Sequence, residues 1–208
     1  RFMQELRAAC DEYGLFLGVD EVQSGMGRSG RLFAYEWSDI TPDILSTAKG
    51  IAGGFPMGAV LTTETIAKHM TPGSHGTTFG GSPLACAAAN AVLDILLAPG
   101  FLAGVRDRAA QLDAGFDRLV ATYPDVFSGR RGLGLLIGLK CKVDVATVQN
   151  AALGEGMLSV TAGDNVLRML PPLTVTEADC TDALSMLDRA AQRVQAHLAA
   201  TAKPENVA

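Results

Sequence analysis

Apolar and polar positions follow a helical period at the start of the chain and then change to a continuous apolar run. Apolar residues recur every three to four positions from Phe2 to Tyr13, which predicts an amphipathic helix that ends at Gly14. The run from Leu15 to Val19 follows and leads into polar positions up to Gln23. Strands covered on both faces have such runs, so we expect a buried strand over 15–23. A helix that leads into a strand is half of a βαβ unit, whose first strand we expect upstream.

The rest of the pattern predicts two domains. Short strands are expected over 44–47 and 58–62, a short helix over 64–70, and an alanine-rich helix from an N-cap at Ser82, with Pro83 in its first turn, to about residue 97. Pro99 and Gly100 mark the boundary between domains 1–98 and 99–208. In the second domain we expect helices over 101–123, 145–153 and 177–199, strands over 133–140, 157–161 and 166–170, and a disordered tail over 200–208. Thr176 with Asp179 is typical of a capping box.

Composition excludes several classes of partner. The 208 residues are 48% hydrophobic, enough for a sizeable core, and a formal net charge of -5 gives no general reason to expect nucleic acid or an anionic membrane. No apolar run approaches the roughly 20 residues of a membrane-spanning helix. The four cysteines, Cys10, Cys86, Cys141 and Cys180, are far apart and only three histidines are present, so neither a metal site nor a disulfide framework is indicated. We expect buried thiols in a soluble, cytoplasmic protein.

Acidic residues stand at the end of the first predicted strand. In open α/β sheets ligands bind beyond the carboxyl ends of the strands, where Asp20 lies. Because side chains alternate across a strand, Asp20 and Val22 should share one face and Glu21 the other. One carboxylate and one apolar side chain would then contact the same ligand. The alternative is that Asp20 and Glu21 cap a turn or pair with an arginine.

Lys49 has an unusual setting for a lysine. Almost every neighbour between residues 44 and 58 is apolar or small. Burial disfavours the ammonium form and favours the free amine that Schiff-base chemistry requires. The alternative is a surface lysine that follows a short strand.

Residues 25–30 match the pattern Gly-x-Gly-x-x-Gly. A dinucleotide-binding turn opens directly into a helix and has an acidic residue about 20 positions further on. Neither feature is present here, and Lys49 stands near the position where that acidic residue belongs. The sequence therefore does not indicate a dinucleotide site.

Several motifs in the same order resemble the core signature of class III pyridoxal-phosphate aminotransferases. They are Asp20 to Gly30, Pro42-Asp43, Lys49-Gly50, Gly53 to Gly58, and Gly76 to Cys86. Within that class they are most similar to the enzymes that act on acetylornithine and succinylornithine. The resemblance covers essentially the whole chain and implies an α/β fold, a partial fold-type-I large domain with a mainly parallel sheet plus a smaller C-terminal α+β domain. It also implies that about half of the enzyme is absent from this sequence.

The resemblance assigns roles around the cofactor, pyridoxal phosphate. It implies that Lys49 binds the cofactor as a Schiff base and then carries the proton between the substrate α-carbon and the cofactor. Asp20 would pair with the pyridinium nitrogen, Val22 would pack against the ring, and Gln23 would reach the phenolic oxygen. Glu21 is grouped with these cofactor-binding residues as a neighbour of the cluster.

Further roles follow from the downstream motifs. Thr78 matches the position that donates to the cofactor phosphate across the dimer interface, and Thr77 matches a substrate-contacting position. A simple turn is the alternative for both threonines. Ser82 stands where an asparagine is more usual. Arg168, flanked by apolar residues, matches the arginine that binds the substrate α-carboxylate through two parallel hydrogen bonds.

The implied function is transfer of an amino group from N-acetylornithine, or a close relative, to 2-oxoglutarate in arginine biosynthesis. Amino acids and 2-oxo acids are the expected substrates, and a homodimer with shared sites is the expected assembly. One alternative is another ω-aminotransferase, acting on ornithine, 4-aminobutyrate or succinylornithine. A non-catalytic truncated product is the other, and the 208 residues alone are expected to be inactive.

Overall fold

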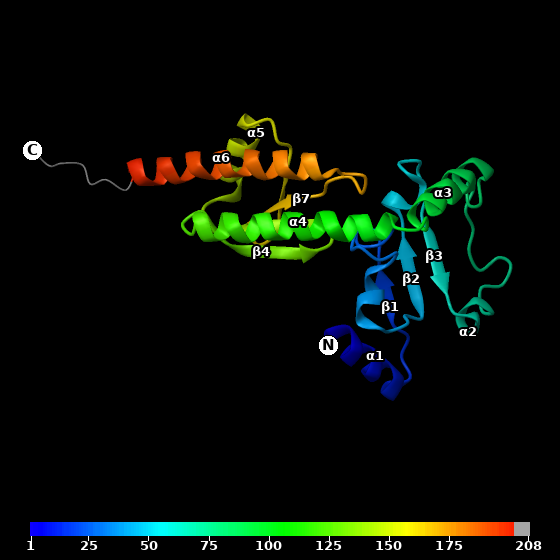
Figure 1. The fold of residues 1–208 in the computed structure, drawn as a ribbon. Coiled ribbons are helices and arrows are strands. Elements are labelled where there is room, and N and C mark those ends of the chain that lie inside the picture. Colours follow the sequence, from blue (N-terminus) through cyan, green and yellow to red (C-terminus); the bar gives the residue numbers. More distant parts are fainter. Residues whose placement is uncertain (202–208) are drawn as a thin grey trace, which may run out of the picture. The chain divides into compact units, whose positions relative to one another are not determined.

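The chain forms two compact units in a computed structural model that describes residues 1–201. The first unit is Arg1–Ala103 and the second begins at Gly104 (Figure 1). The division lies a few residues after Pro99 and Gly100. That these units correspond to a large and a small domain of one enzyme stays a prediction.

The first unit contains a small mixed sheet. Its elements are α1 (Phe2–Tyr13), β1 (Gly18–Asp20), η1 (Ala34–Ser38), β2 (Ile44–Thr47), η2 (Lys49–Ala52), β3 (Ala59–Thr62), α2 (Glu64–Ala67) and α3 (Pro83–Leu96). The strand order is β1-β2-β3, with β1 parallel and β3 antiparallel to β2 (Figure 1). The middle strand β2 is therefore hydrogen-bonded to a neighbouring strand on each side, which restrains its position in this unit.

The first strand is shorter than predicted, and the expectation of a buried strand over 15–23 is wrong at both ends. Leu15 and Phe16 are 59% and 63% exposed, and only Leu17 and Glu21 of residues 15–23 are buried. After Asp20 the chain turns instead of extending, since the backbone N–H of Val22 donates to Asp20 Oδ1 at 2.9 Å. An apolar run predicts burial only where a second layer covers it, and β1 pairs with β2 alone among the described strands.

An ion pair fixes α1 to the sheet. The Asp43 carboxylate accepts a hydrogen bond from Arg7 Nη1 at 2.6 Å and another from the backbone N–H of Leu17 at 2.7 Å. The hydrogen bond from Arg7, followed by that from Leu17, lowers the pKa of the Asp43 carboxyl. Asp43 therefore joins the helix, the approach to β1 and the start of β2.

Helix α3 begins where the sequence predicts. Pro83 stands in the first turn, where its missing N–H leaves no bond unmade, but the Ser82 side chain makes no capping hydrogen bond. Further along, Val92 Cγ2 lies 3.1 Å from the position a Cβ would take at Gly53. Only a glycine lets α3 pack so closely on the end of η2, and Gly53 also has a left-handed φ of 60°.

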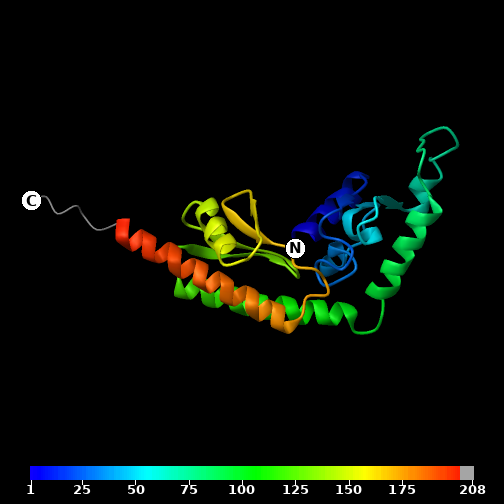
Figure 2. The ribbon, with the colours of Figure 1, turned by 90° about the horizontal axis from the view of Figure 1, so that it is seen from above.

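The second unit combines two long helices with an antiparallel sheet. Its elements are α4 (Phe101–Thr122, which begins in the first unit), β4 (Phe127–Leu133), β5 (Leu136–Cys141), α5 (Val145–Gly154), β6 (Val160–Ala162), β7 (Val166–Met169) and α6 (Glu177–Thr201). The sheet order is β4-β5-β7-β6, and α4 and α6 run side by side (Figure 2). The largest fully buried side chains are Phe116, Phe127, Leu135, Leu139, Leu167 and Leu187. These side chains form the core of the unit.

Two predicted strands of the second unit need correction. The strand expected over 133–140 crosses a hairpin turn, and β4 before that turn was not predicted. The sequence of β4 is largely polar and exposed, and Gly132 has a φ of 116° with a Cβ position only 2.0 Å from the Leu136 carbonyl oxygen. Such a strand lacks apolar alternation. The strand expected over 157–161 begins only at Val160.

The ends of α6 are defined differently. The capping box is confirmed, since Asp179 N donates to Thr176 Oγ1 at 3.2 Å and Thr176 N donates to Asp179 Oδ2 at 2.9 Å. The helix continues to Thr201, so the start of the tail expected over 200–208 is helical, and 202–208 lies outside the described residues. Among residues 1–201 no single helix is long and apolar enough to cross a membrane, although α3 and α4 reach that length and composition as a pair.

The expectation of four buried thiols is half right. Cys141 and Cys180 are buried, whereas Cys10 and Cys86 are half-exposed, and all four are free. Burial raises the pKa of the Cys141 thiol to about 11, which keeps it in its unreactive protonated form.

Candidate functional site

The carboxyl ends of two adjacent parallel strands bring Asp20 and Lys49 to the same edge of the first sheet. Asp20 is the last residue of β1 and lies in register with Ser46 of β2. The ladder continues one residue further, where Glu21 N donates to the Ser46 carbonyl oxygen at 2.8 Å. Lys49 follows β2 directly and begins η2. This is the edge at which ligands bind in open α/β sheets.

Lys49 occupies a strained backbone conformation. Its φ is 48°, in the left-handed region that costs a residue with a side chain about 1 kcal/mol or more. The side chain is exposed, contrary to the expected apolar setting, although Ile51 and Ala52 beside it are buried. Lys49 lies where β2 gives way to η2, so the character of its sequence neighbours does not determine its own exposure. Strain of this kind is concentrated at functional sites.

The Asp20 carboxylate has one oxygen engaged and one open. Oδ1 accepts from the backbone N–H of Val22 at 2.9 Å and from Ser46 Oγ at 3.5 Å. Within residues 1–201 Oδ2 accepts no hydrogen bond. Asp20 therefore caps the turn through Oδ1, as the alternative reading of the sequence expected, and Oδ2 can accept a hydrogen bond from a ligand. Because Val22 lies in the turn after β1, strand alternation does not place it beside Asp20.

Glu21 is buried and fully engaged by the protein. Its side chain is 3% exposed, Oε2 accepts from Ser24 Oγ at 2.5 Å, and Oε1 accepts from the backbone N–H of Tyr35 at 2.8 Å. These bonds fix the turn after β1 to η1. A direct contact between Glu21 and a cofactor would require one of them to break, so the geometry favours a supporting role.

The glycine-rich turn packs against the backbone of Glu21 and the Phe33 ring. At Gly25 a Cβ would lie 2.8 Å from the Glu21 carbonyl oxygen and 2.9 Å from Phe33 Cδ1. The segment continues as turns and not as a helix, as expected from the missing dinucleotide context. Gln23, predicted to reach the cofactor, is exposed at the start of this turn.

Thr77 and Thr78 lie in an exposed loop between α2 and α3. Thr77 Oγ1 accepts from the backbone N–H of Gly80 at 3.1 Å, so the turn alternative describes Thr77. Figure 2 shows the loop projecting beyond the start of α3. The structure does not bring either threonine to the strand ends that carry Asp20 and Lys49. The role of Thr78 across a dimer interface stays a prediction.

Arg168 lies on an inner strand of the second unit. It is in register with Gly138 of β5 and Val160 of β6, and it is half-buried between the buried residues Leu167 and Met169. The apolar flanks expected from the sequence are thus present. Arg168 belongs to one unit, and Asp20 and Lys49 belong to the other.

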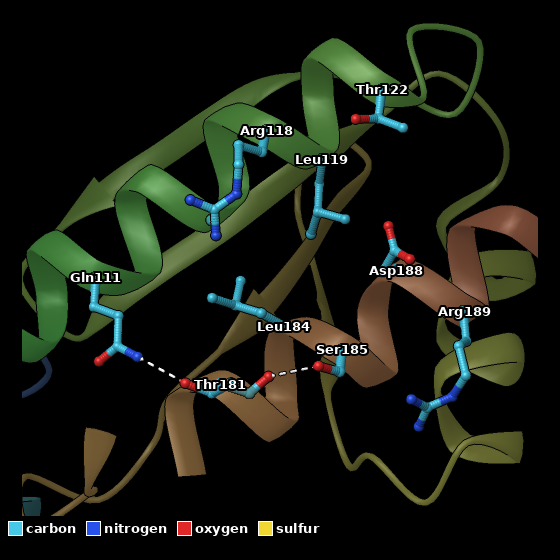
Figure 3. A pocket seen from close by; sticks show the side chains of 10 residues that line it. Gln111, Arg118, Leu119, Thr122, Thr181, Leu184, Ser185, Asp188 and Arg189 are labelled. Carbon is cyan, nitrogen blue, oxygen red and sulfur yellow. Dashed lines mark hydrogen bonds between the residues drawn. The ribbon is translucent and has the colours of Figure 1, made fainter. Parts of the chain in front are cut away.

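A groove between α4 and α6 is a separate feature of the second unit (Figure 3). Its volume is about 480 Å³. The lining residues are Gln111, Gly115, Arg118, Leu119, Thr122, Thr181, Leu184, Ser185, Asp188 and Arg189. None of them is a predicted site residue. Gln111 Nε2 donates to Thr181 Oγ1 at 3.1 Å, so part of the polar lining bonds across the two helices.

Comparison with known proteins defines the class. The family model described as aminotransferase class-III matches residues 1–191, so the chain belongs to the class-III aminotransferase family. Its solved relatives are pyridoxal-phosphate enzymes of fold type I, which confirms the predicted fold class.

The most similar relatives include acetylornithine aminotransferases. The chain is 51% identical to that of Mesorhizobium japonicum over 185 residues, 89% of this chain and 46% of the relative. The N-acetylornithine aminotransferase from Stenotrophomonas maltophilia has a TM-score of 0.82 at 35% identity, with 96% of this chain and 52% of that chain covered. The ornithine aminotransferase from Toxoplasma gondii has a TM-score of 0.89 at 30% identity, with 94% and 48% covered. The chain thus spans about half the length of the relatives it matches.

The residues at the sheet edge fit the cofactor of this class. Pyridoxal phosphate needs an amine for covalent attachment and a carboxylate for its ring nitrogen. Lys49 supplies an exposed amine, and Asp20 supplies an open carboxylate oxygen on the adjacent parallel strand. These two side chains therefore supply the amine and the carboxylate that the cofactor needs.

Proposed function

We propose that the complete protein containing this chain transfers an amino group from N-acetylornithine, or a close relative, to 2-oxoglutarate in arginine biosynthesis. The observation that carries the proposal is the placement of Asp20 and Lys49 at the ends of adjacent parallel strands. The chain that carries them is 51% identical in sequence to an acetylornithine aminotransferase over 185 residues. The proposed assembly is a cytoplasmic homodimer, with amino acids and 2-oxo acids as substrates.

Each residue has a distinct task in this proposal. Bound pyridoxal phosphate supplies a ring that accepts electrons from the substrate α-carbon. Lys49 would hold the cofactor covalently through its amine, and the same amine would take and return the substrate α-proton. Asp20 would accept a hydrogen bond from the ring nitrogen and keep that nitrogen protonated.

The remaining contacts surround these two residues. Val22 packs against the ring and Gln23 donates to the phenolic oxygen. Thr77 contacts the substrate, and Thr78 donates to the cofactor phosphate of the partner subunit. Arg168 binds the substrate α-carboxylate with two parallel hydrogen bonds, an interaction that suits the planar guanidinium group.

Ornithine is the second candidate amino donor. Its support is the TM-score of 0.89 to the ornithine aminotransferase from Toxoplasma gondii, which exceeds the value of 0.82 for the N-acetylornithine aminotransferase from Stenotrophomonas maltophilia. Identity to the acetylornithine relatives is higher, so N-acetylornithine is placed first.

Borohydride reduction followed by peptide mapping tests the site in the full-length protein. Reduction makes the link between lysine and cofactor permanent, and the label should map to Lys49. A label on Lys68, Lys140 or Lys142 would overturn the assignment. Initial rates with N-acetylornithine, ornithine, succinylornithine and 4-aminobutyrate, each with 2-oxoglutarate, then rank the amino donors.

A further inference from the structure

The middle strand of the first sheet carries a hydroxyl group next to Asp20. Ser46 is in parallel register with Asp20 on one side and in antiparallel register with Val60 on the other. The backbone N–H of Glu21 donates to the Ser46 carbonyl oxygen at 2.8 Å, so the register is fixed at this point. Ser46 is therefore held by strands on both sides, which gives its side chain a defined position.

Two donors converge on the same oxygen of Asp20. The backbone N–H of Val22 lies 2.9 Å from Oδ1, and Ser46 Oγ lies 3.5 Å from it. The second distance is longer than an ordinary hydrogen bond between oxygens, and contacts in unliganded sites are often long in this way. With Oδ1 held by the protein, the plane of the carboxylate is restrained, and Oδ2 accepts no hydrogen bond from residues 1–201.

The next residue provides a contrast on the same strand. Thr47 is 2% exposed and its Oγ1 has no hydrogen-bond partner among the described residues. Successive side chains of a strand point to opposite faces, so the Thr47 hydroxyl lies on the face away from Asp20. The strand therefore offers two adjacent hydroxyl groups, of which only that of Ser46 reaches the carboxylate.

We propose that Ser46 is a positioning residue, whose hydroxyl orients the Asp20 carboxylate toward the cofactor ring nitrogen. The inference rests on the proposed function, since pyridoxal phosphate is the partner of Asp20 there. Without this hydroxyl the carboxylate rotates more freely about its last torsion. The bond to the ring nitrogen is then made for less of the time, and both cofactor affinity and ring protonation decrease.

The test uses the full-length protein loaded with pyridoxal phosphate that carries ¹⁵N in the ring. The variants are Ser46→Ala, which removes the hydroxyl, Ser46→Thr, which retains it, and the matched control Thr47→Val. The ¹⁵N chemical shift reports ring protonation, and a titration gives the Kd of the cofactor. We expect Ser46→Ala to move the signal toward the unprotonated position and to weaken binding about 3- to 10-fold, the effect of losing one ordinary hydrogen bond. Ser46→Thr and Thr47→Val should match the wild type.

The outcomes separate this inference from the proposed function. A Ser46→Ala protein with the wild-type shift and Kd would overturn the role of Ser46 alone, as would an equal shift in Thr47→Val or in Ser46→Thr. Wild-type protein that binds no cofactor would overturn the proposed function too. If Ser46→Ala does not fold, Ser46→Cys keeps the volume with a weaker donor, and its shift must lie between those of the wild type and an unprotonated ring.

Discussion

Asn165 connects three segments of the second unit just before the strand that carries Arg168. Its Oδ1 accepts from the backbone N–H of Val145 at 2.9 Å, at the start of α5. Its Nδ2 donates to the carbonyl oxygens of Cys141 at 2.8 Å and Val143 at 2.7 Å, at the end of β5 and just beyond it. Asn165 also has a left-handed φ of 57°. We predict that Asn165→Ala is among the most destabilising single changes in this unit.

The magnitude follows from these contacts. Alanine removes three hydrogen bonds at about 1 kcal/mol each, and it lacks the local side-chain hydrogen bonding that lets asparagine adopt a positive φ, which adds up to about 1 kcal/mol, so the expected loss is about 3–4 kcal/mol. Asn165→Gly loses the same bonds but adopts a positive φ without strain, so about 3 kcal/mol or less is expected. Asn165→Asp keeps the acceptor for Val145 but places a carboxylate against two carbonyl oxygens, and so should also destabilise.

Native-state hydrogen exchange on the full-length protein measures this loss locally. The free energy of opening for the Val145 amide should fall in the order wild type, Asn165→Gly, Asn165→Ala. Amides of β2 in the first unit serve as the internal control and should not change. An Asn165→Ala protein whose Val145 amide opens within about 1 kcal/mol of the wild type would refute the reasoning, because even a single lost hydrogen bond predicts that much.

Three further predictions concern the substrate site, acid stability and packing. Arg168→Lys should lower kcat/KM for amino and oxo acids, with a loss of transition-state stabilisation of about 2–4 kcal/mol, while cofactor affinity is retained. Unchanged kinetics of both half-reactions would contradict a substrate role. The pKa of Asp43 is lowered, chiefly by Arg7, so its stabilising effect is full above the unfolded value of about 3.9 and is lost as the pH falls through the folded value. Thermal unfolding of Asp43→Asn should therefore depend less on pH in that acid range, and parallel curves would count against the ion pair. At Gly138 a Cβ would lie 2.5 Å from a valine methyl group, so Gly138→Ala should destabilise by about 1–3 kcal/mol in denaturant unfolding, whereas Gly18→Ala, with nothing within 4 Å, should not.

Long periodic segments of this chain could be predicted closely from the sequence. Helices α4 and α6 begin where expected, because each repeats an apolar stripe over many turns, and α6 has the capping box of Thr176 and Asp179. Strand β4 could not be predicted in this way. It is an exposed edge strand with a polar sequence, and only its pairing with β5 defines it. Local pattern and tertiary pairing are separate sources of information, and β4 depends on the second.

The placement of Asp20 and Lys49 at one edge of the sheet was likewise predictable, but the exposure of the Lys49 side chain was not. Parallel strands that end at Asp20 and Thr47 must present the following residues at one edge, and the sequence indicates both strand ends. Lys49 instead begins η2 with a φ of 48°, and its side chain is exposed. Its apolar neighbours do not indicate this, since Ile51 and Ala52 are buried as their composition predicts.

The different roles of Asp20 and Glu21 illustrate how hydrogen bonding selects a ligand-binding acid. The two residues are adjacent and chemically similar, but β1 ends between them. The Glu21 carboxylate is buried with both oxygens bonded to the protein, and a ligand would have to replace one of those bonds. Asp20 is exposed, with Oδ1 held by Val22 and Ser46 and Oδ2 open. A carboxylate fixed through one oxygen can bind a protonated ring nitrogen through the other at little entropic cost, so we expect Asp20 to be the acid that contacts the cofactor, whereas Glu21 supports the turn.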